Sequence, residues 1–261
     1  MVAEMKSQPI DIAIRMACKY DQRCKTEFTS LHSRVAHLFF DINIGCPYGL
    51  PHVATFHQAT FAPLSERAME LFLAAGYRRN GNCLYSMLCR ECSACVPIRL
   101  HPAEFIANRN QKRAVAKNHD VEKMLLPLQP GKEDYALCEK FLRSRYPREN
   151  NSGVGYYRDF FLNSIVNSAQ LQYRIGERLI GTAIIDIGYN WLNAVYFYFD
   201  PEESRRSLGT YNILCLIDLC REWEIEFLYL GYYIGSVPAM SYKGNFRPHH
   251  LLRGNDWTRQ G

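Results

Sequence analysis

The sequence predicts an α+β fold built on an antiparallel or mixed sheet with flanking helices, and three observations carry this prediction. Three short segments rich in Ile, Val and Tyr lie between residues 173 and 200, with Gly176 and Gly188 in the connections between them. Such segments are typical of strands joined by hairpin turns. From Arg205 onward, apolar residues recur at helical spacing. A last strand-like segment, residues 227–234, follows that helix and completes the predicted core.

The joint between the third strand and the helix carries a candidate phosphate-binding loop. Its sequence, Arg206-Ser-Leu-Gly209-Thr-Tyr211, resembles the Arg/Gln-x-x-Gly-x-Gly/Ala loop of the acetyltransferase superfamily, although Tyr211 replaces the last small residue. The free N–H groups and positive dipole end of a helix start attract phosphate, and glycine lets phosphate approach the backbone. Arg205 and Arg206 add positive charge. The alternative is an ordinary helix start with two arginines. We therefore expect an acetyltransferase-like (GNAT-like) fold.

Length and composition place limits on the protein. The chain has 261 residues, 48% of them hydrophobic, which suits one large domain or two small ones with a real core. A net charge of +5 is too small to indicate a partner by itself. We expect a cytoplasmic protein without a membrane partner, because the sequence has neither a bilayer-spanning apolar stretch nor a signal-peptide block. In that compartment, ten cysteines favour thiols or metal ligands over disulfides.

The first 44 residues contain predicted elements but no recognisable chemistry, and residues 45–100 are more informative. Residues 10–20 predict a short amphipathic helix and residues 35–44 a strand. A second helix is expected over residues 64–76, because Ser65 is a favourable N-cap and a glycine stands at the other end. Asn80-Gly81 then predicts a hairpin turn.

A cluster of cysteines follows that hairpin. Cys89, Cys92 and Cys95 stand three residues apart, so three sulfurs can face one metal ion or cluster. Cys46 is the candidate fourth ligand and Cys83 the reserve. This pattern predicts a zinc ion or an iron–sulfur cluster. The alternative is a set of close-packed free thiols, since cysteine is a small residue that is often buried.

A basic helix is predicted over residues 105–118, with Asn108 as its cap. Arg109, Lys112, Arg113 and Lys117 recur on one face, which suits either a phosphate backbone or simple solvation. Pro127 and Pro130 predict a boundary, with an N-terminal domain over residues 1–130 and an acyl-transfer domain over residues 131–261. Parts of residues 60–125 could pack into the second domain. Further helices are expected at residues 133–146 and 159–167.

Taken together, the ordered motifs resemble the aminoacyl-tRNA–protein transferase family. They resemble most the bacterial branch that moves leucine onto proteins with N-terminal Asp or Glu, and the eukaryotic arginyl-tRNA–protein transferases are wider relatives. The motifs are Cys46-Pro-Tyr48, Gly76-Tyr-Arg-Arg-Asn-Gly81, Tyr85 through the three cysteines to Val96-Pro-x-Arg99, Glu104-Phe105, Arg109-x-Gln-Lys-Arg113, Ala194-Val-Tyr196, Phe199-Asp-Pro201, Arg206-Ser-Leu-Gly-Thr-Tyr211, Leu228-Tyr-Leu-Gly-Tyr-Tyr-Ile234, Met240-x-Tyr-Lys243 and Phe246-Arg-Pro248.

The resemblance implies that an acceptor α-amine attacks the ester of an aminoacyl-tRNA, expected to be leucyl-tRNA. Because that ester is already activated, no cofactor is required for the chemistry. The implied partners are charged tRNA and protein N-termini, and DNA is not among them. The implied catalytic or acceptor-contacting residues are Asp186, Tyr232, Tyr242 and Lys243. The implied tRNA-binding residues are Arg109, Lys112, Arg113, Arg205, Arg206 and Gly209.

The sequence departs from the family pattern in two loops, residues 147–153 and 235–239. Relatives carry a histidine with glycines in the first and basic residues in the second, whereas this chain does not. Basic side chains in the second loop would be natural partners of an acidic acceptor. A basic or bulky apolar acceptor is therefore an alternative. Two other classes also stay open: an acyl-CoA-dependent acetyltransferase, and a non-catalytic module that binds tRNA or metal.

Overall fold

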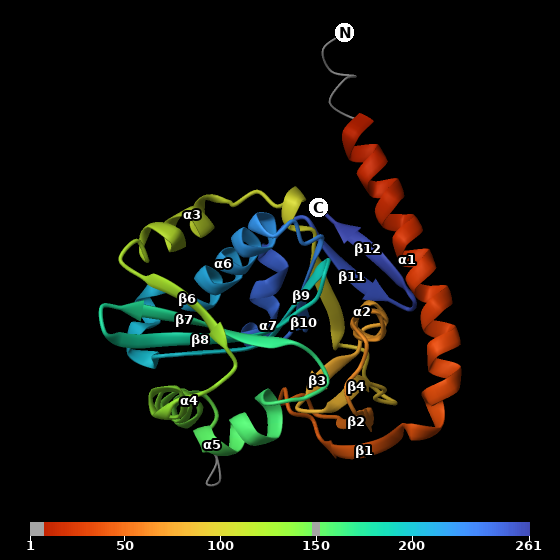
Figure 1. The fold of residues 1–261 in the computed structure, drawn as a ribbon, viewed down its shortest axis with the longest axis horizontal. Coiled ribbons are helices and arrows are strands. Elements are labelled where there is room, and N and C mark those ends of the chain that lie inside the picture. Colours follow the sequence, from red (N-terminus) through yellow and green to blue (C-terminus); the bar gives the residue numbers. More distant parts are fainter. Residues whose placement is uncertain (1–7, 148–151) are drawn as a thin grey trace.

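The computed structural model describes residues 8–147 and 152–261, and its strands form two sheets (Figure 1). The smaller sheet has the order β1-β2-β4-β3 and the larger one the order β12-β11-β5-β10-β9-β8-β7-β6. The strands of the smaller sheet are β1 (Phe40–Gly45), β2 (Val53–Thr60), β3 (Arg78–Asn80) and β4 (Cys83–Met87). Those of the larger are β5 (Val96–Leu100), β6 (Glu122–Pro127), β7 (Ser168–Ile175), β8 (Arg178–Ile187), β9 (Trp191–Phe199), β10 (Phe227–Tyr233), β11 (His249–Arg253) and β12 (Asp256–Gln260).

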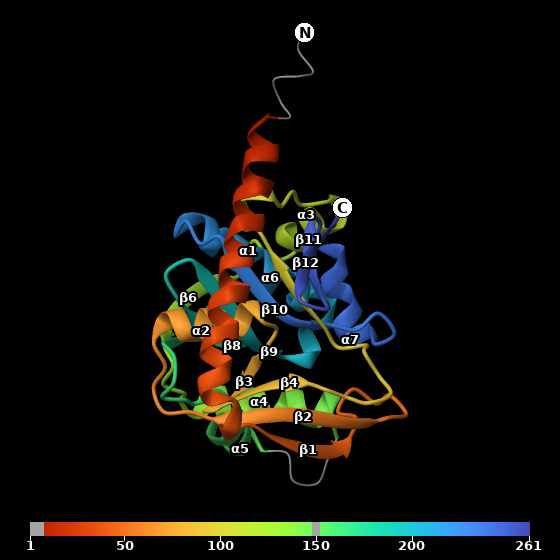
Figure 2. The same cartoon turned by 90° about the vertical axis from the view of Figure 1, so that its right-hand side faces the viewer.

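Helices cover both faces of the larger sheet. Helices α3 and α6 lie on one face, and α4 and α5 on the other (Figures 1 and 2). The α-helices are α1 (Gln8–Val35), α2 (Glu66–Ala74), α3 (Arg109–Ala116), α4 (Lys132–Arg145), α5 (Gly153–Tyr156), α6 (Leu208–Glu222) and α7 (Pro238–Ser241). Shorter turns are η1 (Ala36–Leu38), η2 (Pro102–Glu104), η3 (Tyr157–Phe161), η4 (Pro201–Arg206) and η5 (Tyr242–Asn245).

Strands β9 and β10 of the larger sheet diverge and leave an opening between them. These two strands run parallel, but they pair only at their first residues, from Phe227 opposite Trp191 to Tyr229 opposite Asn193. Past Tyr229, β10 pairs among the described strands only with β5, which lies on its other side, and β9 pairs only with β8. The chain leaves β9 through η4 and enters α6. The start of α6 therefore follows directly from the strand that borders this opening.

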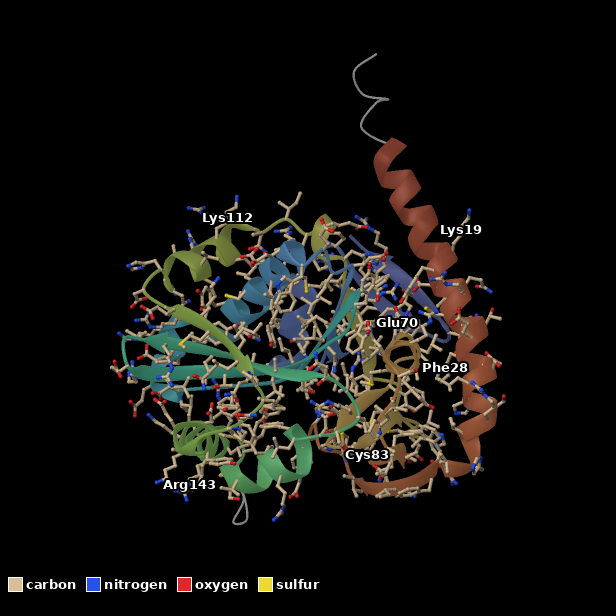
Figure 3. The ribbon with its side chains drawn as sticks, in the orientation of Figure 1. Lys19, Phe28, Glu70, Cys83, Lys112 and Arg143 are labelled. Carbon is tan, nitrogen blue, oxygen red and sulfur yellow. The ribbon has the colours of Figure 1, made fainter. Side chains whose placement is uncertain are left out.

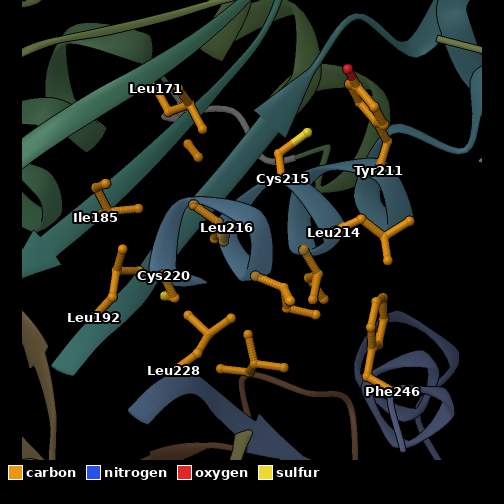
Figure 4. Close-up of a cluster of buried hydrophobic side chains, with 14 of the residues drawn as sticks. Leu171, Ile185, Leu192, Tyr211, Leu214, Cys215, Leu216, Cys220, Leu228 and Phe246 are labelled. Carbon is orange, nitrogen blue, oxygen red and sulfur yellow. The ribbon is translucent and has the colours of Figure 1, made fainter. Parts of the chain in front are cut away.

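The core that holds α6 in place is apolar and closely packed. Leu216 and Cys220 of α6 lie against Leu192 of β9 and Leu228 of β10 (Figure 4), and all four are buried. Full burial of such a side chain stabilises the fold by about 1.5–3 kcal/mol. A second cluster, between α4, η3 and the opposite face of the sheet, includes the buried residue Ile184. Packing on both faces fixes the sheet and the helix that follows it.

Several predicted elements are confirmed and others need correction. Helix α2 begins after Ser65, whose hydroxyl accepts from the Ala68 amide, and α3 has the predicted Asn108 cap. The predicted helix at 159–167 is wrong, because the helical turns end at Phe161. The first helix is longer than expected, and the strand after it begins only at Phe40.

The predicted boundary at residue 130 does not separate two sheets. Strands β5 and β6 both precede it, yet both belong to the larger sheet. The expectation that parts of residues 60–125 pack into the second domain describes this arrangement better. The fold class itself, α+β with a mixed sheet and flanking helices, is confirmed. Within the described ranges, no helix combines the length and apolarity needed to cross a bilayer.

Helix α1 is attached to the body through a buried arginine. The Arg99 side chain is fully buried between the rings of Phe227 and Trp257, with its guanidinium carbon 4.5 and 4.3 Å from the two ring centres. It donates to Asp21 of α1 at 2.7 Å. The N-terminal end of α1 extends beyond the rest of the body (Figures 1 and 2).

Two buried histidines beside Arg99 are expected to make the folded state less stable in acid. Burial, and then the charge of Arg99, lower the pKa of His101 to about 2 and that of His250 to about 3. In the unfolded chain both titrate near 6.5, so only the unfolded state takes up these protons as the pH falls. Unfolding free energy should therefore fall below pH 6.5, by up to about 1.4 kcal/mol per pH unit for each histidine.

Urea unfolding at pH 7, 6 and 5 measures this loss. A variant with His101→Gln and His250→Gln serves as the control, and it should lose less stability over the same range. Equal slopes for the variant and the unchanged chain would contradict the prediction.

Candidate functional site

The candidate site begins where α6 starts. Ser207 adopts a left-handed backbone conformation there, with φ of 58° and ψ of 44°, and its side chain does not cap the helix. A helix start has free N–H groups and the positive end of the helix dipole. A Cβ placed on Gly209 would meet only the Tyr242 hydroxyl, at 3.9 Å. The backbone of the first turn is therefore open toward Tyr242.

The two arginines of η4 differ in what they can do. Arg206 is fixed by two bonds to Asp120, at 2.7 and 2.9 Å, and by one to Glu203 at 2.7 Å. Arg205 is exposed, and its side chain has no ion-pair partner among the described residues. Arg205 is thus available to a ligand, whereas Arg206 holds the loop in place.

Helix α3 is bonded to both turns that flank the site. At its end, Lys117 donates to the Arg205 carbonyl at 3.0 Å, and Asn118 donates to the Arg206 carbonyl at 2.8 Å. Gln111 donates to the Asn245 carbonyl of η5 at 3.1 Å. The outer face of α3 carries exposed basic residues, and Lys112 points away from the body in Figure 3. These basic residues are Arg109, Lys112 and Arg113.

Turn η5 brings a hydroxyl and an amine to the same region. The Lys243 amine donates to the Tyr232 carbonyl at 3.0 Å. The residue as a whole is only partly buried, but burial of its amine, and then the charge of Arg78, lower the pKa of Lys243 to about 7. Burial raises the pKa of Tyr242 to about 12, so its hydroxyl keeps its proton near neutral pH and can donate.

Arg78 of β3 completes this group. It is 5% exposed, and its two terminal nitrogens donate to the Tyr77 and Gly231 carbonyls at 2.8 and 2.7 Å. Its guanidinium lies 5.5 Å from the ring centre of Tyr232. Its Nε has no hydrogen-bond partner among the described residues, and burial lowers its pKa. The site therefore contains a free helix start, a phenol that can donate, and two cations.

A large cavity lies apart from this group, between α1 and the β11–β12 edge. Its volume is about 990 Å³, and Phe28, Tyr77 and Trp257 are among the residues that line it. Phe28 lies between α1 and the body in Figure 3. Tyr77 and Tyr232, which contact Arg78, also line this cavity, as does Cys95 of the cysteine cluster, whereas Arg205, Gly209, Tyr242 and Lys243 are not among its lining residues.

Comparison with known proteins decides the family. Residues 17–113 match the N-terminal model of the arginine-tRNA-protein transferases, and residues 133–253 match the C-terminal model. The aspartate/glutamate leucyltransferase of Thiobacillus denitrificans is 35% identical over 196 residues, which are 74% of this chain and 82% of that protein. The chain belongs to the aminoacyl-tRNA–protein transferase family.

Two further members of the family are similar to this chain over most of their length. The leucyltransferase of Shewanella sp. (strain MR-7) is 39% identical over 71% of this chain and 78% of its own length. The leucyltransferase of Chromohalobacter salexigens is 32% identical over 87% of this chain and 94% of its own length. The chain is thus an aminoacyltransferase that uses aminoacyl-tRNA.

Solved structures show weaker likeness. A GCN5-related glucosamine N-acetyltransferase region of a fungal β-N-acetylglucosaminidase has a TM-score of 0.41 at 11% identity, over 84% of this chain and 24% of that one. The L-PGS protein of Bacillus licheniformis has a TM-score of 0.38 at 10% identity, over 66% and 54%.

Most of the predicted site residues of this transferase lie together. Gly209, Arg205 and Tyr242 lie at the start of α6, Lys243 follows Tyr242 in η5, and α3 is bonded to both η4 and η5. Sequence reasoning missed Arg78. Its motif, Gly76-Tyr-Arg-Arg-Asn-Gly81, predicts a hairpin and contributes to the family resemblance but gives Arg78 no role by itself, although two consecutive arginines beside a buried strand are a signal of buried charge.

Asp186 does not fit the catalytic role predicted for it. Its side chain is fully buried and accepts bonds from Arg79 at 2.6–2.9 Å, from Ser168 at 2.6 Å and from Asn193 at 2.9 Å. An incoming amine cannot reach either oxygen unless this network breaks. Asp186 therefore balances the charge of Arg79 inside the protein.

The Tyr232 hydroxyl is also unsuited to the role predicted for it. It is directed at the Gly76 carbonyl, at 3.5 Å, and the residue is 3% exposed. Burial raises its pKa well above the usual range. Its ring lies against the Arg78 guanidinium and its carbonyl accepts from the Lys243 amine, so Tyr232 positions these two side chains.

The predicted metal site stays a prediction. Burial, and then the neighbouring thiols of Cys89, Cys46 and Cys92, raise the pKa of Cys95 to about 12, so the four lie near one another. In the part of the chain that the structure describes, however, no group of three or more His, Cys, Asp or Glu side chains is arranged to hold a metal ion.

Metal analysis of the purified protein tests that prediction. We expect about one equivalent of zinc, or an iron–sulfur absorption band, and its loss in Cys89→Ser. Cys138→Ser, at a buried thiol outside the cluster, is the control. Absence of metal from protein purified without oxygen would contradict the assignment.

Proposed function

We propose that this transferase moves leucine from leucyl-tRNA to the α-amine of cytoplasmic proteins that begin with Asp or Glu, as a step that marks them for degradation. The names of its relatives support this donor and these acceptors. The structural observation that supports it most is that the open start of α6 faces the Tyr242 hydroxyl, with Lys243 next to Tyr242 in η5.

In this proposal the 3′ end of the tRNA lies across the start of α6. Its phosphates accept hydrogen bonds from the free N–H groups of the first turn and pair with Arg205. Gly209 lets the backbone come close to them, since no side chain covers it. The basic face of α3 contacts the acceptor stem of the tRNA. Arg206 acts indirectly, because it fixes η4 against the end of α3.

The chemical step then needs few protein groups. The neutral α-amine, whose pKa is about 8, attacks the ester carbonyl, and the Tyr242 hydroxyl donates to the oxyanion that forms. A carbon–nitrogen bond forms and the carbon–oxygen bond to the ribose breaks. A proton of the amine passes to the departing ribose oxygen. Holding both large substrates at one place supplies most of the acceleration.

A transfer assay tests the proposal. Leucyl-tRNA with radiolabelled leucine is offered with peptides that differ only at the first residue, which is Asp, Glu, Asn, Lys or Phe. We expect kcat/KM for the Asp and Glu peptides to be at least about tenfold higher than for the others. Preferred transfer to Lys or Phe would favour the non-acidic alternative. Label from acetyl-CoA but none from leucyl-tRNA would contradict the proposal.

A further inference from the structure

Two cations flank one point beside Gly231 of β10. A Cβ placed on this glycine would lie 3.7 Å from the Lys243 amine and 3.8 Å from Arg78 Nε. Gly231 has a φ of 80°, a conformation that favours glycine, so this position stays without a side chain. The two positive groups come from β3 and η5, elements far apart in the chain.

Neither cation has a carboxylate partner among the described residues. Apart from Lys243, the groups that act electrostatically on Arg78 are phenols, those of Tyr232, Tyr85, Tyr229 and Tyr48. Lys243 faces Arg78, the Tyr232 carbonyl and the sulfur of Met240, at 3.0 Å from the carbonyl and 3.8 Å from the sulfur. Burying a charge without a counter-charge is costly, and an arginine with a free Nε has a donor to offer.

We propose that Arg78 and Lys243 form the subsite that binds the side-chain carboxylate of the acceptor's first residue. This inference rests on the function proposed above and adds the residues that select Asp or Glu. A carboxylate at the point beside Gly231 would accept from Arg78 Nε and from the Lys243 amine. This subsite also explains how an acidic acceptor can be bound although residues 235–239 carry no basic side chain, because β3 and η5 supply the positive charge instead.

The position of the subsite suits the reaction. Lys243 follows Tyr242 directly in η5, and consecutive Cα atoms are about 3.8 Å apart. Tyr242 faces the start of α6, whereas Lys243 faces Gly231. One residue of an acceptor can therefore have its side-chain carboxylate on the two cations and its α-amine directed toward the ester. An Asn or Gln side chain could accept one of these hydrogen bonds but would leave both cations without a counter-charge.

Acceptor binding should also be linked to protonation. Lys243 is partly neutral above pH 7 in the free protein, and a bound carboxylate favours its charged form. Affinity for an Asp peptide should therefore fall as the pH rises from 7 to 9, with proton uptake on binding. Affinity for the matching Asn peptide should not follow this trend.

The first experiment compares Asp and Asn peptides in the full-length protein with saturating leucyl-tRNA. For Arg78→Gln and for Lys243→Gln, we expect kcat/KM for the Asp peptide to fall about 10- to 150-fold, and that for the Asn peptide to change less than about threefold. Lys243→Arg should retain part of the preference. Arg253→Gln, at an exposed arginine of β11, is the control and should behave as the unchanged protein.

The ratio of kcat/KM for the Asp peptide to kcat/KM for the Asn peptide distinguishes loss of the subsite from misfolding. Misfolding lowers both rates together, so a normal melting temperature is required of at least one variant, and Lys243→Gln at a partly exposed position is the milder change. An unchanged Asp/Asn ratio in the folded variants overturns the subsite. Absence of transfer by the unchanged protein overturns the proposed function instead. In that case calorimetric titration with the two peptides still tests the subsite: tighter binding of the Asp peptide, lost in Lys243→Gln, supports it, and equal binding overturns it.

Discussion

Replacing Asp186 by Ala is expected to destabilise the protein by about 3–5 kcal/mol, because it leaves a buried arginine without its counter-charge. Arg79 and Asp186 are both fully buried at their side chains and are joined by three bonds of 2.6–2.9 Å. Ser168 and Asn193 would lose their acceptor as well. This cost is a large part of the whole stability of a typical domain. Loss of transfer in this variant would follow from unfolding.

Denaturant unfolding, followed by circular dichroism, measures the change. Asp159→Ala is the matched control, since Asp159 also pairs with an arginine, Arg158, but at an exposed position. Its unfolding midpoint should stay unchanged within error. An Asp186→Ala protein with a normal midpoint and no transfer would contradict the structural role and restore the catalytic one.

Replacing Gly209 by Glu is expected to lower transfer from leucyl-tRNA by about 100-fold or more, because like charges placed in contact cost several kcal/mol. The carboxylate would occupy the free N–H groups and repel the tRNA phosphates. The fold should not suffer, since a Cβ at this position meets only the Tyr242 hydroxyl at 3.9 Å. An acid in the first turn of a helix is favourable by about 0.3–1 kcal/mol, so the melting temperature should stay equal or rise.

Gly209→Gln and Gly209→Ala separate charge from size. Gln has the shape of Glu without its charge, so most of the activity lost in Gly209→Glu should return in Gly209→Gln. Gly209→Ala should lose less than about tenfold. The rate is measured in single turnovers at limiting leucyl-tRNA, because under that condition the rate depends on how tightly the tRNA binds. Equal rates for all four proteins would mean that the tRNA end does not approach Gly209.

The sequence predicts the local elements well because their signals are local. The apolar spacing of α6, the hairpins around Gly176 and Gly188, and the caps Ser65 and Asn108 each depend on residues a few positions apart. A local pattern also predicts the connection between β9 and α6, and it places Gly209 there. The resemblance of motifs added Tyr242 and Lys243.

What the sequence misses depends on contacts between distant segments. Strand β5 lies between β10 and β11, which are over 120 residues further along the chain, and no local pattern specifies that pairing. The same holds for side-chain roles. Asp186 stands at a strand end like a catalytic acid, and only its contact with Arg79 reveals a buried ion pair. Arg78 resembles an ordinary strand residue until Lys243 is seen on the other side of Gly231.

The most direct test of the central claim is where a charged tRNA end binds. A minihelix ending in CCA, with leucine attached by a stable amide bond, can be titrated into isotope-labelled protein while the backbone amide signals are recorded. We expect the largest shifts at Leu208, Gly209 and Thr210, and their loss in Gly209→Glu. Saturable binding that leaves these three amides unmoved, or moves only residues that line the cavity beneath α1, would contradict it.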